Sequence, residues 1–104
     1  MPGYRALHSP MIWEINQFET DPALAREFEG AFAEARPLLL DVPGCCEARL
    51  LRSVERPGVY LVQVGWTKLA DHTEGYPANP LSAQVRALIG PYVRRIEPGH
   101  FTEA

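Results

Sequence analysis

The chain has 104 residues, of which 46% are hydrophobic and 22% charged, and its formal net charge is -3 at pH 7. This length allows one domain with a single core, and the acidic balance excludes the basic surface that nucleic-acid binding requires. No apolar run has the length of a signal peptide or a membrane span, so we expect a cytoplasmic protein without membrane contact. Residues 1–10 are predicted to form a flexible tail before a single domain over residues 11–104.

Two alternating apolar segments, residues 11–18 and 58–66, are predicted to be strands that carry large apolar residues on both faces. On the first of them, Trp13 and Ile15 share one face, and Asn16 shares the other with Phe18. A strand with two apolar faces needs a cover on each side. The remaining sequence predicts only enough helix for one of these covers.

A helix is expected after Asp21, which is a candidate N-cap, with Pro22 at the first helical position. Its apolar stripe has helical spacing and consists of Leu24, Phe28, Ala31, Phe32 and Ala35. Pro37 lacks an N–H and disfavours helical geometry at Arg36, so we expect the helix to kink or stop there.

Residues 45–54 are predicted to form a second strand, which is an edge or mixed strand because Arg49 and Arg52 fall on opposite faces. A short turn then joins it to the strand over residues 58–66 in an antiparallel hairpin. Further helices are expected over residues 69–76 and 81–89. A last strand over residues 93–103 is interrupted by Pro98 and Gly99, which favours an edge position or a bulge.

This order of elements predicts an α+β fold, a ferredoxin-like βαββαβ sandwich with a four-stranded antiparallel sheet and two helices on one face. The other sheet face, with Trp13, Ile15 and Leu61, is then bare. Burial of apolar surface stabilises association by ~25 cal/mol per Å², so we expect a homodimer through this sheet face. The face with Val64 and Trp66 is expected to look toward the helices and to hold a cleft.

The cysteines, Cys45 and Cys46, are adjacent, and neighbours in a strand point to opposite faces, so we expect reduced thiols. A soft metal or an oxidant remains an alternative for this pair. Burial as a small hydrophobic side chain is the reading that we prefer.

The chain resembles the antibiotic biosynthesis monooxygenase family over roughly residues 11–102. The resemblance rests on segments whose order and spacing match the family, namely Phe28-Glu29-Gly30-Ala31-Phe32, Pro43-Gly44-Cys45, Trp66 followed by Leu69-Ala70-Asp71-His72-Thr73, Gly75-Tyr76, Asn79-Pro80 and Gly90-Pro91-Tyr92. It implies a dimeric α/β barrel in which each subunit keeps its own cleft between sheet and helices. Family members that need no cofactor oxygenate quinols or polycyclic phenols, so the resemblance implies a small aromatic substrate and neither flavin nor metal.

His72 is the first candidate catalytic residue, since an imidazole near its neutral pKa can take a phenolic proton. The alternative is a histidine that holds backbone groups at a helix end. Asn16 is the second candidate, because an amide in an apolar strand is expensive unless it is paired. It either donates to a developing oxyanion or has a structural partner.

Five aromatic residues are predicted to bind the substrate: Trp66, Tyr76, Phe18, Tyr92 and Phe32. Core packing is the competing interpretation for Trp66. We expect Glu14 to pair with an arginine such as Arg49, and Arg86 to face solvent unless the cleft opens beside it. For His100, a dimer contact is the alternative to a role in the site.

Haem-degrading proteins of this fold place a histidine ligand on the second long helix, but residues 81–89 contain no histidine, which disfavours haem. The resemblance implies a cofactor-independent monooxygenase that oxidises a small aromatic quinol or polyketide-type phenol with dioxygen. Two alternatives to this function remain. One is a non-catalytic, stress-associated protein that binds a small molecule in the same cleft. The other is a cleft that is filled by Phe28, Phe32 and Trp66.

Overall fold

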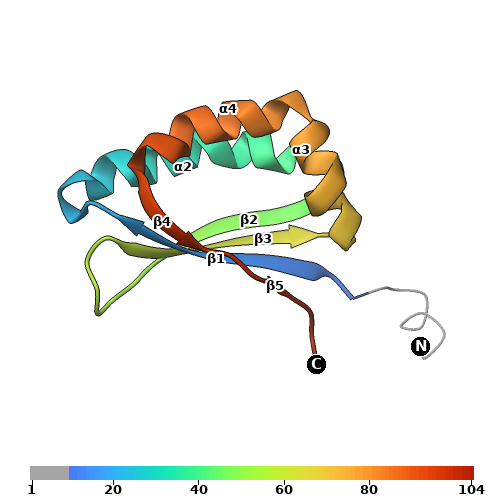
Figure 1. Ribbon diagram of the computed structural model, residues 1–104, viewed down its shortest axis with the longest axis horizontal. Helices are drawn as coiled ribbons and strands as arrows, with labels where there is room; N and C mark the ends of the chain where they lie inside the picture. Colours follow the sequence, from blue (N-terminus) through green and yellow to red (C-terminus); the bar gives the residue numbers. More distant parts are fainter. Residues whose placement is uncertain (1–9) are drawn as a thin grey trace.

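The computed structural model describes residues 10–104, so the predicted tail lies outside the described residues except for Pro10. The described chain forms, in order, β1 (Ile12–Thr20), η1 (Pro22–Leu24), α2 (Ala25–Leu40), β2 (Cys45–Arg52), β3 (Val59–Trp66), η2 (Asp71–Gly75), α3 (Tyr76–Ala78), α4 (Pro80–Ile89), η3 (Gly90–Tyr92), β4 (Val93–Glu97) and β5 (His100–Phe101) (Figure 1). Within residues 10–104, none of these helices has the length and apolar character that crossing a bilayer requires.

The strands form one antiparallel sheet in the order β2-β3-β1-β4, and β5 also pairs with β1. Both long helices lie on one side of this sheet (Figure 1), so the predicted ferredoxin-like α+β fold is confirmed. The predicted hairpin of β2 and β3 is present, with β2 at the edge. Pro98 and Gly99 separate β4 from β5, and the Gly99 carbonyl accepts a 2.9 Å hydrogen bond from the Ile15 amide. The interruption that the sequence predicts therefore falls at the sheet edge.

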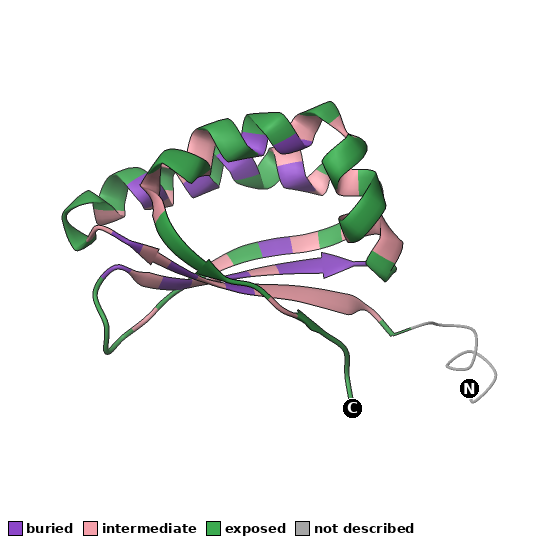
Figure 2. Cartoon of the chain, in the orientation of Figure 1, coloured by how far each residue is buried: buried purple, intermediate pink, exposed green. Residues whose placement is uncertain are grey.

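The core lies between the sheet and the helices (Figure 2). Its buried apolar members come from α2, α4, the three long strands and the loop before β2, and they are Phe18, Phe28, Phe32, Ala35, Leu39, Val42, Ala48, Tyr60, Val62, Val64, Trp66 and Val85. On β1 the buried positions are Asn16, Phe18 and Thr20, which share one face. The predicted division of the strand faces therefore agrees with the burial pattern.

The opposite face of the sheet has no helix over it in the described chain (Figure 1). Trp13, Ile15 and Leu61 are half-buried there, and the side chain of Phe101 on β5 is 54% exposed. A side chain at Gly65 would collide with Met11 and with the Trp13 ring, so the Trp13 indole lies directly over the backbone of β3. This face therefore carries a group of apolar side chains that the chain itself covers only in part.

The helix α2 continues through Pro37 to Leu40, so of the two expected outcomes, a kink or a stop, the stop is wrong. Proline removes only one backbone hydrogen bond, and the buried side chains of Ala35 and Leu39 lie on either side of it in the sequence. Arg36 adds a 2.7 Å hydrogen bond from Nε to the Ala48 carbonyl on β2. Packing on the sheet therefore holds the last helical turn in place.

The predicted helix over residues 69–76 forms as a wide π-helical turn, η2, followed by the single turn of α3. Such turns occur often at functional sites. Gly44 has a positive φ of 87°, and a side chain at this position would collide with Asp71 at the start of η2. This close approach fixes η2 against the turn before β2 and thereby positions His72.

Candidate active site

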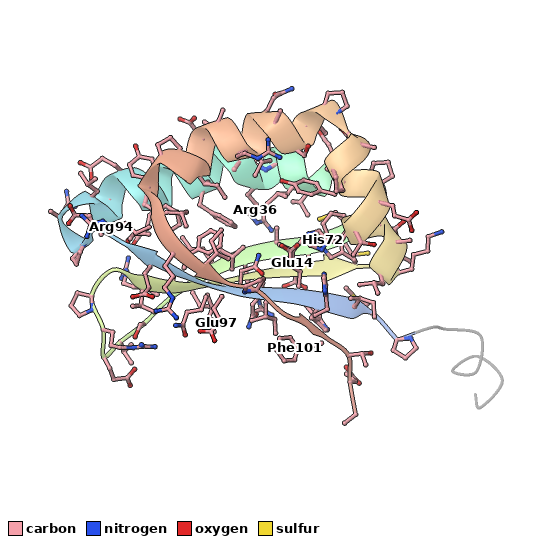
Figure 3. The ribbon with its side chains drawn as sticks, in the orientation of Figure 1. Glu14, Arg36, His72, Arg94, Glu97 and Phe101 are labelled. Carbon is pink, nitrogen blue, oxygen red and sulfur yellow. The ribbon has the colours of Figure 1, made fainter. Side chains whose placement is uncertain are left out.

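Glu14 on β1 is the centre of a hydrogen-bonded cluster on the helix-facing side of the sheet. Its Oε1 accepts a hydrogen bond from Trp66 Nε1 at 3.0 Å, and its Oε2 accepts one from Asn16 Nδ2 at 2.7 Å. His72 Nε2 also lies 3.2 Å from Oε1, at ion-pair distance. Figure 3 shows Glu14 and His72 close together between the sheet and the helices. The predicted pair of Glu14 with Arg49 is wrong, because Arg49 lies on β2 and its Nε contacts Glu47 at 3.3 Å.

The other ring nitrogen of His72, Nδ1, lies 2.7 Å from Nε2 of His100 on β5. One of these two ring nitrogens donates and the other accepts, and the tautomers of the rings decide which. His72 therefore lies between Glu14 on β1 and His100 on β5.

The His72 ring is held between other rings. It stacks on Trp66 with a centroid distance of 5.2 Å and an interplanar angle of 26°, and the Tyr76 ring lies 5.9 Å away. Burial lowers the pKa of His72, and the nearby His100 lowers it further, while the Glu14 carboxylate opposes both effects. His72 is therefore neutral near pH 7.

Asn16 is only 9% exposed, and its Nδ2 donates to Glu14, but its Oδ1 has no hydrogen-bond partner among the described residues. A buried acceptor without a partner costs about 1–3 kcal/mol, so native structures retain few of them. Asn16 is one of the residues that line the cleft described next, and its Oδ1 is buried there without a partner.

A cavity of about 490 Å³ lies between the sheet and the helices, within the range of small-molecule sites. Its walls are mainly apolar and are formed by Glu14, Asn16, Phe18, Phe32, Leu39, Val62, Val64, Tyr76, Val85, Arg86, Ile89, Gly90, Val93, Arg94, Arg95 and Ile96. A second hollow of about 540 Å³ shares Glu14, Asn16 and Ile96 with the first and is also lined by His72 and His100. The alternative of a cleft filled by aromatic side chains is therefore wrong.

Tyr76 lines the first cavity, and burial followed by the Glu14 charge raises its pKa to about 12. Its hydroxyl therefore remains protonated at neutral pH and acts as a hydrogen-bond donor rather than as a base. Arg86 of α4 is exposed and also lines this cavity, so the cleft opens beside it, which is the exception that the sequence left open.

Of the predicted site residues, Asn16, Phe18, Phe32 and Tyr76 line the first cavity and His72 lines the second hollow. Trp66 and Tyr92 are not among the lining residues. Trp66 is 0% exposed, so it supports Glu14 and His72 instead of offering a surface to a ligand. Tyr92 packs on Phe28 at a centroid distance of 6.1 Å.

Two functional candidates, Glu14 and His100, were assigned other roles from the sequence. Strand alternation places Glu14 on the face of Asn16, and that signal was available. The meeting of His72 and His100 depends on the path of the chain after β4, which no local pattern reveals.

The two cysteines are free thiols in the structure. Burial raises the pKa of Cys45 to about 11, so this thiol stays protonated at neutral pH. Among residues 10–104, no three His, Cys, Asp or Glu side chains are grouped so that they could hold a metal ion.

The fold and cleft define a class of small α+β proteins with a cleft between an antiparallel sheet and two helices. The family model of antibiotic biosynthesis monooxygenases matches residues 11–87, and the chain belongs to this family. The uncharacterized protein YczJ of Bacillus subtilis (strain 168) is 32% identical over 79 residues, which cover 76% of this chain and 83% of the relative.

Solved structures agree with this assignment. A Bordetella bronchiseptica protein described as a candidate antibiotic biosynthesis monooxygenase superposes with a TM-score of 0.87 at 28% identity, covering 92% of this chain and 99% of the other. SnoaB from Streptomyces nogalater, described as a cofactor-independent oxygenase, superposes with a TM-score of 0.76 at 23% identity and covers 92% of this chain and 95% of its own. At that identity the second likeness concerns the fold alone.

Proposed function

We propose that the protein is a cofactor-independent monooxygenase that oxidises a small aromatic quinol or polyketide-type phenol with dioxygen. Family membership supports this proposal, and SnoaB is an oxygenase of this kind on the same fold. The observation that carries it is the polar pair of Glu14 and Asn16 in the wall of a mainly apolar cleft. Glu14 Oε2 accepts from Asn16 alone, and Asn16 Oδ1 is buried without a partner among the described residues. A small aromatic phenol suits such a cleft, with its hydroxyl toward the Glu14 carboxylate.

In this proposal Glu14 is the base that touches the substrate, and it takes the hydroxyl proton at Oε2. The electron-rich anion then reduces dioxygen and forms a bond between a ring carbon and one oxygen atom. That atom remains as a quinone carbonyl, while the other leaves as water with the hydroxyl hydrogen and one ring hydrogen. Phenol and dioxygen thus give quinone and water, and the four electrons that reduce dioxygen all come from the ring.

The remaining lining residues have supporting roles. Phe18 and Phe32 provide an apolar wall for the aromatic ring, and the Tyr76 hydroxyl donates a hydrogen bond to negative charge that develops on oxygen. His72 holds Glu14 in place instead of taking the substrate proton itself, because its Nε2 lies 3.2 Å from the Glu14 carboxylate and its Nδ1 is in a hydrogen bond with His100. Trp66 donates to the same carboxylate from the core.

Oxygen uptake by chelator-treated protein, measured with a panel of quinols and phenols, tests the proposal. We expect uptake well above the spontaneous rate of each compound, a loss of about 100-fold or more in Glu14→Gln, and a loss in His72→Ala. Glu34→Gln on the exposed face of α2 is the matched carboxylate control and should retain full activity.

No uptake above the spontaneous rate with any compound would refute the monooxygenase proposal. If the same compounds then bind, as measured by calorimetry, the non-catalytic binding protein is the correct reading. Uptake that the chelator abolishes would contradict a reaction without metal.

We further propose that the chain forms a homodimer through the bare sheet face. Its apolar residues Trp13, Ile15 and Leu61 are half-buried within one subunit, and Phe101 is largely exposed on the same side of the sheet (Figure 3). A second sheet packed on these residues would remove them from water, which is favourable by ~25 cal/mol per Å². The cleft lies on the other side and stays open.

Leu61→Arg tests the dimer, because it places a charge at the centre of this face. Analytical ultracentrifugation should show dimers for the wild type and monomers for the variant. Val54→Arg is the control, since Val54 is 92% exposed in the loop after β2 and should not affect assembly. A wild-type protein that sediments as a monomer would contradict the proposal.

A further inference from the structure

We propose that a hollow between α2 and β2 binds a small anionic molecule, one that carries a phosphate or carboxylate group on an apolar body. The hollow has a volume of about 310 Å³, and three arginines, Arg36, Arg49 and Arg52, line it. We call it the arginine hollow. Among the described residues, Phe32 is the one that lines both this hollow and the first cavity, and Glu14 lines only the latter of the two. The inference therefore stands apart from the proposed function.

Arg36 on α2 is exposed and yet held in one orientation. Its Nε donates a 2.7 Å hydrogen bond to the Ala48 carbonyl on β2, and Figure 3 shows Arg36 in the space between the helices and the sheet. In the part of the chain that the structure describes, no carboxylate lies at ion-pair distance from Arg36. Its charge is thus fixed beside the hollow without being neutralised, which reduces the entropy that is lost when a ligand binds.

Arg52 on β2 is held in a similar way by Glu29 on α2. Its Nε and Nη2 donate to the two carboxylate oxygens at 2.8 and 2.6 Å, and the Tyr60 hydroxyl donates to Oε2 at 2.7 Å. These bonds from Arg52 and Tyr60 lower the pKa of Glu29, so the carboxylate stays ionised at neutral pH. Nη1 of Arg52 takes part in neither bond to Glu29 and keeps its N–H groups for another acceptor.

The arginine hollow has an excess of positive charge, although the chain as a whole is acidic. Three arginines line it against one glutamate, whereas the formal net charge of the chain is -3. Arg49 Nε also contacts Glu47 at 3.3 Å, but these side chains are 53% and 41% exposed, and exposed pairs of this kind are weak. The charges of Arg36 and Arg49 therefore remain available to attract an anion.

The chemistry of the lining selects the kind of ligand. A planar guanidinium group binds phosphate and carboxylate groups through two parallel hydrogen bonds. Phe32, Leu50 and Tyr60 supply apolar surface beside these charges. The volume lies at the lower end of the range for small-molecule sites, so the occupant that fits is a small molecule with one anionic end and one apolar end.

Isothermal titration calorimetry of the whole chain at low ionic strength tests the site with phenyl phosphate, benzoate and inorganic phosphate. We expect phenyl phosphate or benzoate to bind one per chain and more tightly than inorganic phosphate, which has no apolar body. The tighter of the two aromatic probes identifies the anionic group as a phosphate or a carboxylate. If neither binds, the proposal is overturned, and the arginines serve only to cover the edge of the sheet.

Arg36→Gln should weaken the binding of the tighter probe about 10-fold or more, because it removes the charge that has no partner. Arg26→Gln is the matched control, since Arg26 is an exposed arginine of the same helix that does not line the hollow, and it should keep the wild-type affinity. Arg49→Gln is a second test in case the loss of the Arg36 bond to β2 disturbs the fold. Unchanged affinity in both Arg36→Gln and Arg49→Gln would overturn the proposal.

The first cavity is also lined by arginines, so the place of binding needs a measurement of its own. Nuclear magnetic resonance with ¹⁵N-labelled arginine should show the Nε–H signal of Arg36 shifting as phenyl phosphate or benzoate is added. Arg86→Gln, which removes a charge from the first cavity, should leave the affinity unchanged. Binding that is lost in Arg86→Gln and kept in Arg36→Gln would place the anion in the first cavity and overturn the proposal.

These measurements do not use oxygen uptake. A wild type that takes up no oxygen but binds the anion refutes the monooxygenase proposal alone, and an active wild type that binds no anion refutes the arginine hollow alone.

Discussion

Replacement of Asn16 by leucine tests whether the Asn16 amide serves ligand binding or the stability of the fold. Asn16 donates one short hydrogen bond, 2.7 Å long, to the Glu14 carboxylate, and its buried Oδ1 has no partner. Asn16→Leu removes both the bond and the unpaired oxygen. These two changes act in opposite directions on the free energy of unfolding.

The hydrogen bond to a charged group contributes about 1.5–3 kcal/mol, and the unpaired buried acceptor costs about 1–3 kcal/mol. Leucine also places apolar surface against Phe18 and the cavity, where there is room for it. We therefore expect the unfolding free energy of Asn16→Leu to lie within about 1 kcal/mol of the wild type. Thr20→Val on the same face of β1 is the contrast, because the Thr20 hydroxyl is fully satisfied by a 2.9 Å bond to the Gly58 carbonyl. Its loss should cost about 1–2 kcal/mol.

Urea denaturation at one fixed protein concentration measures both variants, with unchanged m values as the condition for comparison. The result expected is that Asn16→Leu is the more stable of the two and yet loses ligand binding or oxygen uptake. A loss of more than about 2 kcal/mol in Asn16→Leu would refute the reasoning, since the amide would then serve the fold. Full activity in this variant would refute the role of Oδ1 in the cleft.

Three further predictions concern stability. Gly58→Ala should cost about 1–3 kcal/mol in urea denaturation, because Gly58 has a φ of 83° and a side chain there would collide with the Thr20 carbonyl; an unchanged midpoint would contradict this. Tyr60→Phe should cost about 1 kcal/mol, because it removes the 2.7 Å bond to Glu29 while Arg52 still holds that carboxylate, and a gain in stability would be unexpected. Stability should fall as the pH drops below about 6.5, because burial lowers the pKa of His72 and the unfolded chain then binds the proton more tightly; His72→Phe should flatten this part of the profile.

The fold could be predicted from the sequence because the patterns that indicate its strands and helices are local and repeated. Alternation on β1 and β3 separated the faces of Trp13 and Asn16, and the stripe of α2 identified the core helix. The sequence did not predict that the helix continues unbroken through Pro37, because the core contacts of Leu39 outweigh the local preference of Pro37. Tertiary packing thus decided the boundary.

The residues of the candidate site could be predicted from the sequence only in part. Asn16, Phe18, Phe32 and Tyr76 followed from strand faces, helix stripes and the family resemblance, and all four line the cavity. The partner of Glu14 was misjudged, because a neighbouring arginine is the usual partner of a strand carboxylate, whereas here an indole N–H and an imidazole from η2 approach it. Such a cluster depends on the wide turn of η2, which the sequence predicted as an ordinary helix.

The two tryptophans lie on opposite faces of the sheet. Trp13 lies over Gly65 on the uncovered face, and Trp66 is sealed in the core against His72. Indole fluorescence responds to the polarity around the ring, so a Trp66→Phe variant would report on the uncovered face alone and a Trp13→Phe variant on the surroundings of the cleft alone. The protein thereby contains two optical reporters of its own, one for the uncovered sheet face and one for the core beside His72, and the two can be followed separately without an added label.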